Sequence, residues 1–312
     1  MNISGTEVEI VTNPYSRSVV PIDSDFEDSI QSVLVKGAWN DGIVDLMLEQ
    51  NIKGLYLNSA KGFKCDDFSF LRKLPQLELL NIIYSPVESL SEIEQLTQLK
   101  SLSISCHWEE RINLSNLNNL ERCFINYGKG ADSIFSCSNL KYLYIDEFKL
   151  KSFDALKELE NLEYLTIGNS SFNQTYLLPA LKKLRKLVLL NCRKLDQIKG
   201  IDQLSKLEWL TIEGSRKLSS IQELKDLENL LILQLSDNKE IESLAPIKKL
   251  TQLKALCFFG DTVFKDGDLA FLESFSSLSL VGFAGRKHYT HKPSKPWNWD
   301  SYESNEIAII RK

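Results

Sequence analysis

The sequence predicts an α/β repeat solenoid, in which short parallel strands stack side by side over one continuous core. Two observations support this prediction. An apolar frame, Leu-x-x-Leu-x-Leu in its commonest form, recurs along the chain, and successive copies are separated by nearly constant steps of 20 to 25 residues. The chain has 312 residues, of which 43% are hydrophobic and 25% charged, so it can bury the core that such a stack requires.

Each copy of the frame predicts one short strand whose alternating apolar residues point inward. The last apolar residue of each copy falls at Val35, Leu57, Ile82, Ile104, Ile125, Ile145, Ile167, Leu189, Ile212, Leu235, Phe258 and Leu280. Twelve strands are therefore expected, each centred about one residue before these positions. One coil cannot bury its apolar row alone, so the coils are expected to stack into a parallel sheet over a shared core.

Between the strands, the better copies place an apolar residue at every third position. One such run consists of Leu195, Ile198, Ile201, Leu204 and Leu207. A period of three suits 3-10 turns or short helical segments. We expect these segments to return the chain on the side of each coil opposite its strand.

The frame resembles that of the leucine-rich repeat family, Leu-x-x-Leu-x-Leu-x-x-Asn/Cys, over about residues 30–282. Its 22-residue step is similar to the subclass shared by the SDS22 type and the bacterial internalins. Cys192 and Asn238 stand where the family places an inward Asn or Cys, but other copies hold residues such as Ser170 there. The resemblance implies a free-standing cytosolic horseshoe of about twelve coils. Its parallel sheet would lie on the concave face, with 3-10 or short helical segments on the convex face.

The N-terminal end differs from the repeat. Residues 1–50 hold two basic and nine acidic side chains, and they are predicted to form an acidic cap that merges with the first coil. Asn40 and Asp41 are expected to begin a helix that runs through about Gln50. Its apolar face would consist of Ile43, Leu46 and Met47.

The solenoid is assigned to residues 30–282 and a C-terminal cap or tail to residues 283–312. The repeat is broken there by Pro293, Pro296, Trp297 and Trp299. Candidates for a closing strand are Ile307, Ile309 and Ile310. Because a stack leaves its terminal core exposed, both ends are expected to cover it.

Signatures of catalysis are missing: no phosphate-binding loop, nucleophile elbow or H-E-x-x-H motif occurs. We therefore predict no enzyme activity, no cofactor and no metal. His288 and His291 would contribute to a metal site only if Asp300 or Glu303 folded back beside them, and a role in covering the last coil is favoured. His107, Glu109 and Glu110 are similarly favoured as a polar rim loop over an acid–base site.

The charge distribution and the spacing of the cysteines indicate which partners and which cellular compartment to expect. Residues 51–285 are nearly balanced in charge, which gives no basic surface for nucleic acid. No apolar run is long enough to span a membrane, and the N-terminus lacks a secretory pattern. The six cysteines are scattered and are expected to be free thiols. A cytoplasmic protein that is monomeric when free is predicted.

The strand pattern also predicts which residues face outward from the sheet. A cluster of aromatic and acidic side chains is expected there: Phe124, Tyr142, Tyr144, Asp146, Tyr164, Trp209 and Glu213. Tyrosine and tryptophan frequently anchor protein interfaces, so this cluster is the candidate partner-binding site. The alternative is that the rings stack across neighbouring strands and only stabilise the sheet.

These features favour a non-enzymatic scaffold that binds one partner protein on its concave aromatic face. The resemblance suggests several roles for such a chain, among them a bacterial immunity protein that neutralises a toxin. Alternatives are a phosphatase-regulatory adaptor of the SDS22 type and the target-recognition part of an effector enzyme. The effector alternative is disfavoured because only about 30 residues flank the repeat at either end, too few for a catalytic domain.

Overall fold

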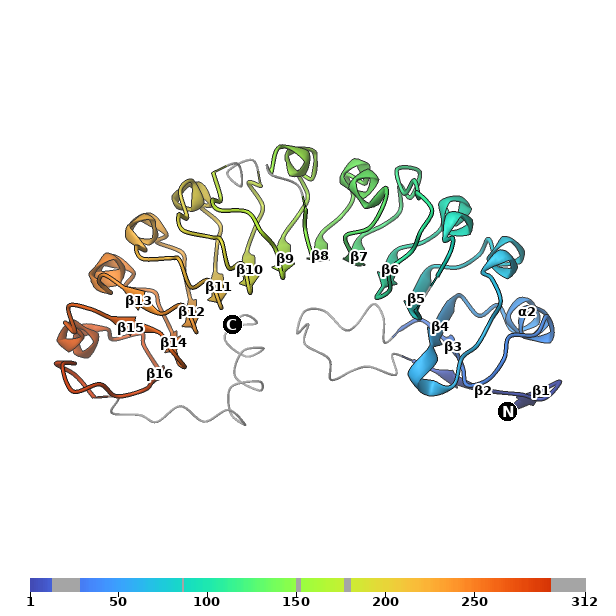
Figure 1. Cartoon of the computed structure of the whole chain (residues 1–312), viewed down its shortest axis with the longest axis horizontal. Coiled ribbons are helices and arrows are strands. Elements are labelled where there is room, and N and C mark those ends of the chain that lie inside the picture. The colour runs from blue at the N-terminus through green and yellow to red at the C-terminus, as the bar shows by residue number, and fades with distance from the viewer. Residues whose placement is uncertain (13–28, 86, 150–152, 177–180, 293–312) are drawn as a thin grey trace. The chain divides into compact units, whose positions relative to one another are not determined.

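The computed structural model describes residues 1–12, 29–85, 87–149, 153–176 and 181–292 (Figure 1). The chain forms two compact units, Met1–Leu143 and Tyr144–Lys312, called here the N-terminal and the C-terminal unit. In both units, strand order in the sheet follows chain order. Helices in the described ranges are short, and none is long and apolar enough to cross a membrane.

The N-terminal unit contains seven described strands and one described α-helix. The strands are β1 (Asn2–Ile3), β2 (Thr6–Val11), β3 (Ser32–Val35), β4 (Gly54–Asn58), β5 (Leu79–Ile83), β6 (Ser101–Ile104) and β7 (Arg122–Asn126). The helices are α2 (Gly42–Glu49) and the 3-10 helices η1 (Ser59–Lys61), η2 (Ser69–Lys73), η3 (Ser91–Gln95) and η4 (Ala131–Ser136). Strands β3 to β7 pair in parallel, and their inward residues stand opposite one another in the register Val33, Leu55, Leu80, Leu102 and Cys123.

The C-terminal unit repeats the same strand and 3-10 pattern. Its strands are β9 (Tyr164–Gly168), β10 (Lys186–Leu190), β11 (Trp209–Glu213), β12 (Ile232–Ser236), β13 (Glu240–Ile241), β14 (Ala255–Phe258), β15 (Val263–Phe264) and β16 (Leu280–Phe283), while β8 (Tyr142–Asp146) contains the boundary between the units. Its 3-10 helices are η5 (Asp154–Glu158), η7 (Ile201–Gln203), η8 (Gln222–Asp226), η9 (Ala245–Lys249) and η10 (Ala270–Ser274). A small parallel sheet of β13 and β15 lies between the main strands and the 3-10 helices of its coils (Figure 1).

The predicted α/β repeat solenoid is confirmed, and eleven of the twelve expected strands stand at their expected positions. The prediction for the last strand is wrong by three residues, because Phe258 pairs with Phe283 and not with Leu280. The rings of Phe258 and Phe283 stack with centroids 4.6 Å apart, and this packing fixes the register. Leu278 and Leu280 are consequently only half-buried.

The N-terminal end closes the sheet with antiparallel pairing. β2 runs antiparallel to β3, and β1 antiparallel to β2. The predicted helix is confirmed as α2, and the Oδ1 atom of Asn40 accepts a hydrogen bond from the amide of Gly42 at its start. Ile43 and Met47 are fully buried, whereas Leu46 is half-buried.

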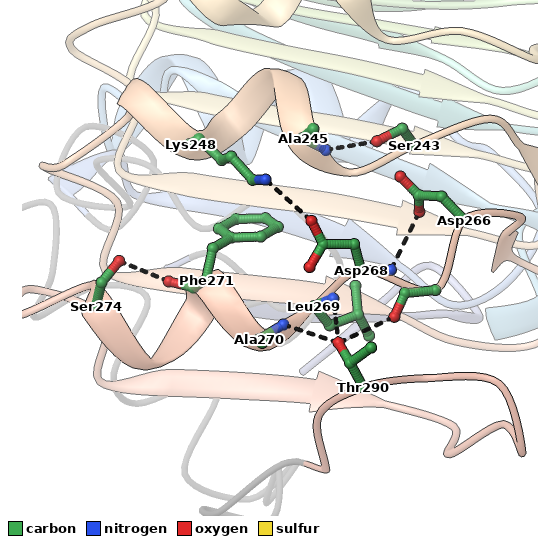
Figure 2. Close-up of polar contacts among 11 residues, drawn as sticks. Ser243, Ala245, Lys248, Asp266, Asp268, Leu269, Ala270, Phe271, Ser274 and Thr290 are labelled. Atoms are coloured by element: carbon green, nitrogen blue, oxygen red, sulfur yellow. Dashed lines mark hydrogen bonds and ion pairs between the residues drawn. The ribbon is translucent and has the colours of Figure 1, made fainter.

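At the other end, residues 284–292 pack against the last coil. The Oγ1 atom of Thr290 accepts hydrogen bonds from the amides of Leu269 and Ala270 at the start of η10, as Figure 2 shows. The hydroxyl of Tyr289 accepts a hydrogen bond from the amide of Phe264, and its ring lies edge-on to Phe258. The predicted closing strand at residues 307–310, with the prolines and tryptophans before it, lies outside the described residues.

A row of charged side chains of alternating sign precedes the strands. In the N-terminal unit, Lys53 and Lys100 donate to the two carboxylate oxygens of Glu78 at 2.7 and 2.8 Å. Partial burial would raise the pKa of Glu78, but these two hydrogen bonds outweigh it and lower the pKa. In the C-terminal unit, Arg185 donates to Glu208 through Nε and Nη2. Opposite charges on neighbouring coils therefore reinforce the register of the strands.

Candidate partner-binding face

The outward face of the sheet consists of three columns of side chains. The first column precedes the first inward residue of each strand, the middle column lies between the two inward residues, and the third column follows the second inward residue. In β10 these columns hold Lys186, Val188 and Leu190, while Leu187 and Leu189 point into the core. The seven candidate residues are distributed over all three columns.

Three of the candidate aromatic residues belong to the first column, and the structure buries them. Tyr142, Tyr164 and Trp209 are only 7, 8 and 3% exposed. The guanidinium of Arg122 lies 4.1 Å from the centre of the Tyr142 ring, and the ammonium of Lys186 lies 3.0 Å from the centre of the Trp209 ring. The rings of Tyr142 and Trp209 therefore pack against first-column side chains of adjacent coils, as the alternative interpretation of the aromatic cluster expects.

Hydrogen bonds also hold the buried rings in place. The Nε1 atom of Trp209 donates to Thr211 at 3.0 Å, and the hydroxyl of Thr211 donates in turn to Gln234 on β12. Arg185 donates to the hydroxyl of Tyr164 at 3.3 Å. Because these aromatic side chains are buried, their truncation should lower the stability of the fold.

The remaining candidates are more accessible. Phe124, in the middle column of the N-terminal unit, is half-buried. In the C-terminal unit, Tyr144 and Asp146 are half-buried, and Glu213 is exposed. The structure thus places Tyr144, Asp146 and Glu213 on one surface of the C-terminal unit.

Tyr144 and Asp146 converge over a glycine of the next strand. A Cβ atom on Gly168 would lie 2.4 Å from Oδ1 of Asp146 and 3.2 Å from the hydroxyl of Tyr144. Only glycine leaves room for this approach. Asn169 then donates to Oδ1 of Asp146 at 2.8 Å. Burial and the charge of Asp146 raise the pKa of Tyr144, so its hydroxyl keeps its proton and stays a donor.

Sequence reasoning did not include Val188 and Leu190 in the site. Both are half-buried and lie in the middle and third columns of β10. The signal was available, because residues 187–190 read Leu-Val-Leu-Leu. A strand that is polar on one face alternates, so an unbroken apolar run indicates apolar side chains on the outward face as well. We define the C-terminal face as Tyr144, Asp146, Val188, Leu190 and Glu213.

The carboxylates of this face form no ion pair with the residues that the structure describes. None of the ion pairs formed by the described residues includes Asp146, Glu213 or Asp237, which follows Ser236 at the end of β12. Partial desolvation and the nearby charge of Asp237 raise the pKa of Glu213. The ionised form of Glu213 is therefore less favourable here than in water, and a cation brought by another molecule would stabilise it.

A comparison with solved structures supports the architecture. An internalin (inlF) from Listeria monocytogenes matches with a TM-score of 0.59 and 20% sequence identity, over 85% of this chain and 83% of that chain. This chain has the leucine-rich-repeat fold.

Two further solved structures match with lower TM-scores. The functional domain of InlJ from Listeria monocytogenes has a TM-score of 0.48 and 16% identity, over 77% of this chain and 60% of that one. A leucine-rich-repeat protein of Leptospira interrogans has a TM-score of 0.43 and 16% identity, over 88% and 91%. No family model matches the chain, and no curated protein matches its sequence.

Two of the three histidines of the leucine-rich-repeat chain, His288 and His291, take part in structural contacts. His288 bonds to the carbonyl of Phe264 through Nε2 at 2.9 Å, and His291 lies 3.1 Å from a carboxylate oxygen of Glu273. The described residues contain no group of three side chains arranged to hold a metal ion. Asp300 and Glu303, the proposed further ligands, lie outside the described residues.

In the other candidate cluster, His107, Glu109 and Glu110 are all exposed.

The cysteine thiols are unreactive. All six cysteines are free, and five of them are buried. Burial raises the pKa of Cys192 and of Cys257 to about 12. A thiol that keeps its proton at neutral pH is a poor nucleophile and a poor metal ligand. Cys192 instead occupies the inward position predicted for it, and its Sγ atom contacts the carbonyl oxygens of Ile167 and Leu190.

Proposed function

We propose that the chain is a non-enzymatic scaffold that binds one partner protein through its C-terminal face. The proposal rests on the combination of apolar and acidic side chains on this face. Apolar contact area from Tyr144, Val188 and Leu190 adjoins the carboxylates of Asp146 and Glu213, which have no cationic partner among the described residues. Interface centres typically combine an aromatic or aliphatic anchor with a few polar groups that fix orientation.

The charge of the face favours a basic partner. A lysine or arginine of that partner would pair with Asp146 or Glu213 and would relieve the unfavourable ionisation of Glu213. Opposite charges would also speed the encounter of the two proteins. A basic toxin fits this description, and a bacterial immunity protein is accordingly the sharper form of the proposal. A phosphatase-regulatory adaptor and the recognition part of an effector remain the alternatives.

The class of partner is decided by affinity purification. The tagged chain is purified from its native cell, and the proteins that co-purify are identified by mass spectrometry. A small basic protein in stoichiometric amount supports the immunity role, whereas a phosphatase catalytic subunit supports the adaptor role. If no protein co-purifies in stoichiometric amount, the scaffold proposal fails.

We expect the double substitution Tyr144→Ala/Leu190→Ala to weaken binding of that partner by about 2 kcal/mol or more, because it removes the apolar contact area of the face. Titration calorimetry on the purified pair measures the change. Tyr176→Ala is the matched control, since Tyr176 is 61% exposed and lies outside the face. Unchanged affinity in the double variant would place the interface elsewhere on the chain.

Charge reversal tests the electrostatic part separately. Asp146→Lys and Glu213→Lys should each slow association with a basic partner, and the effect should be larger at low salt, where attraction is least screened. Stopped-flow or surface plasmon resonance measures the association rate. Glu228→Lys changes the net charge equally at an exposed position outside the face. An equal effect of Glu228→Lys would mean that the face itself does not steer the partner.

We also propose that the chain works in the cytoplasm and is monomeric when free. Six free thiols suit a reducing compartment. Fractionation of the native cell and light scattering of the purified chain test the two statements.

A further inference from the structure

A shallow depression of about 730 Å³ opens beside the small sheet of β13 and β15 in the C-terminal unit. Its charged lining residues are Arg216, Lys217, Lys239, Glu240, Asp261, Lys265 and Arg286. Five of them are basic and two are acidic, so the depression carries a local charge of +3 in a chain whose net charge is -5. We call it the basic depression.

The two acidic residues already have basic partners. Asp261 pairs with Arg216 at 3.8 Å, and Glu240 pairs with Lys265 at 3.4 Å. Lys217 and Lys239 are exposed, and neither takes part in an ion pair with a described residue. The positive charge in excess therefore resides on these two lysines and on Arg286.

Arg286 is oriented by the backbone. Its Nη2 atom donates to the carbonyl of Gly260 at 3.0 Å, which uses one of the five N–H donors of the guanidinium. A guanidinium held in this way is suited to bind a carboxylate through two parallel hydrogen bonds. The depression thus offers one oriented guanidinium and two exposed ammonium groups.

The form of the depression favours a segment of chain over a small molecule. Val263 is its one apolar lining residue, whereas small-molecule sites are mostly apolar and enclose their ligand. The lining comes from four successive coils, represented by Arg216, Lys239, Asp261 and Arg286. At about 4.8 Å per coil these span about 14 Å, the length of about four extended residues.

We propose that the basic depression binds a carboxylate-rich segment of a protein. Carboxylates along an extended segment would meet Lys217, Lys239 and Arg286 in turn. A nucleic acid is disfavoured because Glu240 and Asp261 interrupt the basic lining and the chain as a whole is acidic. The inference goes beyond the proposed function, because the C-terminal face favours a basic partner and this surface favours an acidic one.

Fluorescein-labelled hexaglutamate is the probe, and its binding to the full chain is followed by fluorescence anisotropy at pH 7 and low ionic strength. We expect saturable binding that weakens as salt is added. Lys217→Glu/Lys239→Glu should weaken it about tenfold or more, because two attractive charges become repulsive. Lys182→Glu/Lys206→Glu is the matched control, with the same change of charge at exposed positions outside the depression, and should change binding less than about twofold.

Several outcomes would overturn the proposal. They are the absence of hexaglutamate binding, an equal loss in the two charge-reversed variants, and tighter binding of an oligothymidylate of equal charge. Circular dichroism checks that each variant is folded, and Lys217→Gln offers a milder change if the double variant is not. Tyr144→Ala/Leu190→Ala should bind hexaglutamate as the native chain does. This result separates failure of the basic depression from failure of the C-terminal face.

Discussion

Replacing Leu187 or Leu210 with alanine is expected to lower the free energy of unfolding by about 2–5 kcal/mol. Both side chains are fully buried, and they stand opposite each other in the register of β10 and β11. Each substitution removes buried apolar area and leaves a cavity that the neighbouring coils fill only in part. Chemical denaturation of the full chain measures the loss.

Val188→Ala is the matched control for this experiment. Val188 lies between Leu187 and Leu189 on the same strand, but it points outward and is half-buried. Its truncation should cost less than about 1 kcal/mol, because little buried area is lost. If Val188→Ala were as destabilising as Leu187→Ala, the assignment of inward and outward residues would be wrong.

Asn238→Ala is expected to cost about 1–3 kcal/mol, because it leaves the buried amide of Ser215 without a partner. Asn238 is fully buried, its Oδ1 atom accepts from the amide of Ser215 at 2.9 Å, and its Nδ2 atom donates to the carbonyl of Ile212 at 2.7 Å. Both partners belong to the preceding coil, so the asparagine side chain connects one coil to the next. Denaturant unfolding measures the change.

An exposed asparagine provides the comparison. Nδ2 of Asn229 donates to the carbonyl of Ser205 at 2.7 Å, also in the preceding coil. Water can replace this bond when the side chain is removed, so Asn229→Ala should cost less than about 1 kcal/mol. Similar losses for Asn229→Ala and Asn238→Ala would show that burial does not set the cost at Asn238.

Most of the fold could be predicted because inward apolar residues alternate with outward residues along each strand. This alternation indicates which side chains of the strand point into the core. The last strand could not, since its register depends on Phe283 stacking against Phe258 one coil away. The phenylalanine lies three residues beyond the apolar residue that completes the frame. A periodic pattern extended to the end of the chain therefore placed this strand too early.

The accessibility of the candidate site residues could be predicted less well, for a related reason. Alternation places Trp209 on the outward face, but its exposure depends on Lys186 one coil earlier, which covers the ring. Likewise, the approach of Tyr144 and Asp146 depends on the glycine at position 168. Whether one side chain covers another, or two side chains approach each other, depends on residues about 22 positions apart in the sequence. These contacts can be recognised only once the register between the coils is known.

The alternating charge of Lys53, Glu78 and Lys100 has a consequence for how such a chain can change in length. Loss of the coil that carries Glu78 would place Lys53 and Lys100 next to each other on neighbouring coils. Duplication of that coil would place two glutamates next to each other in the same way. Like charges in direct opposition are destabilising. Removing or adding two coils together would preserve the alternation. In this part of the chain, only the insertion or deletion of coils in pairs keeps opposite charges on neighbouring coils.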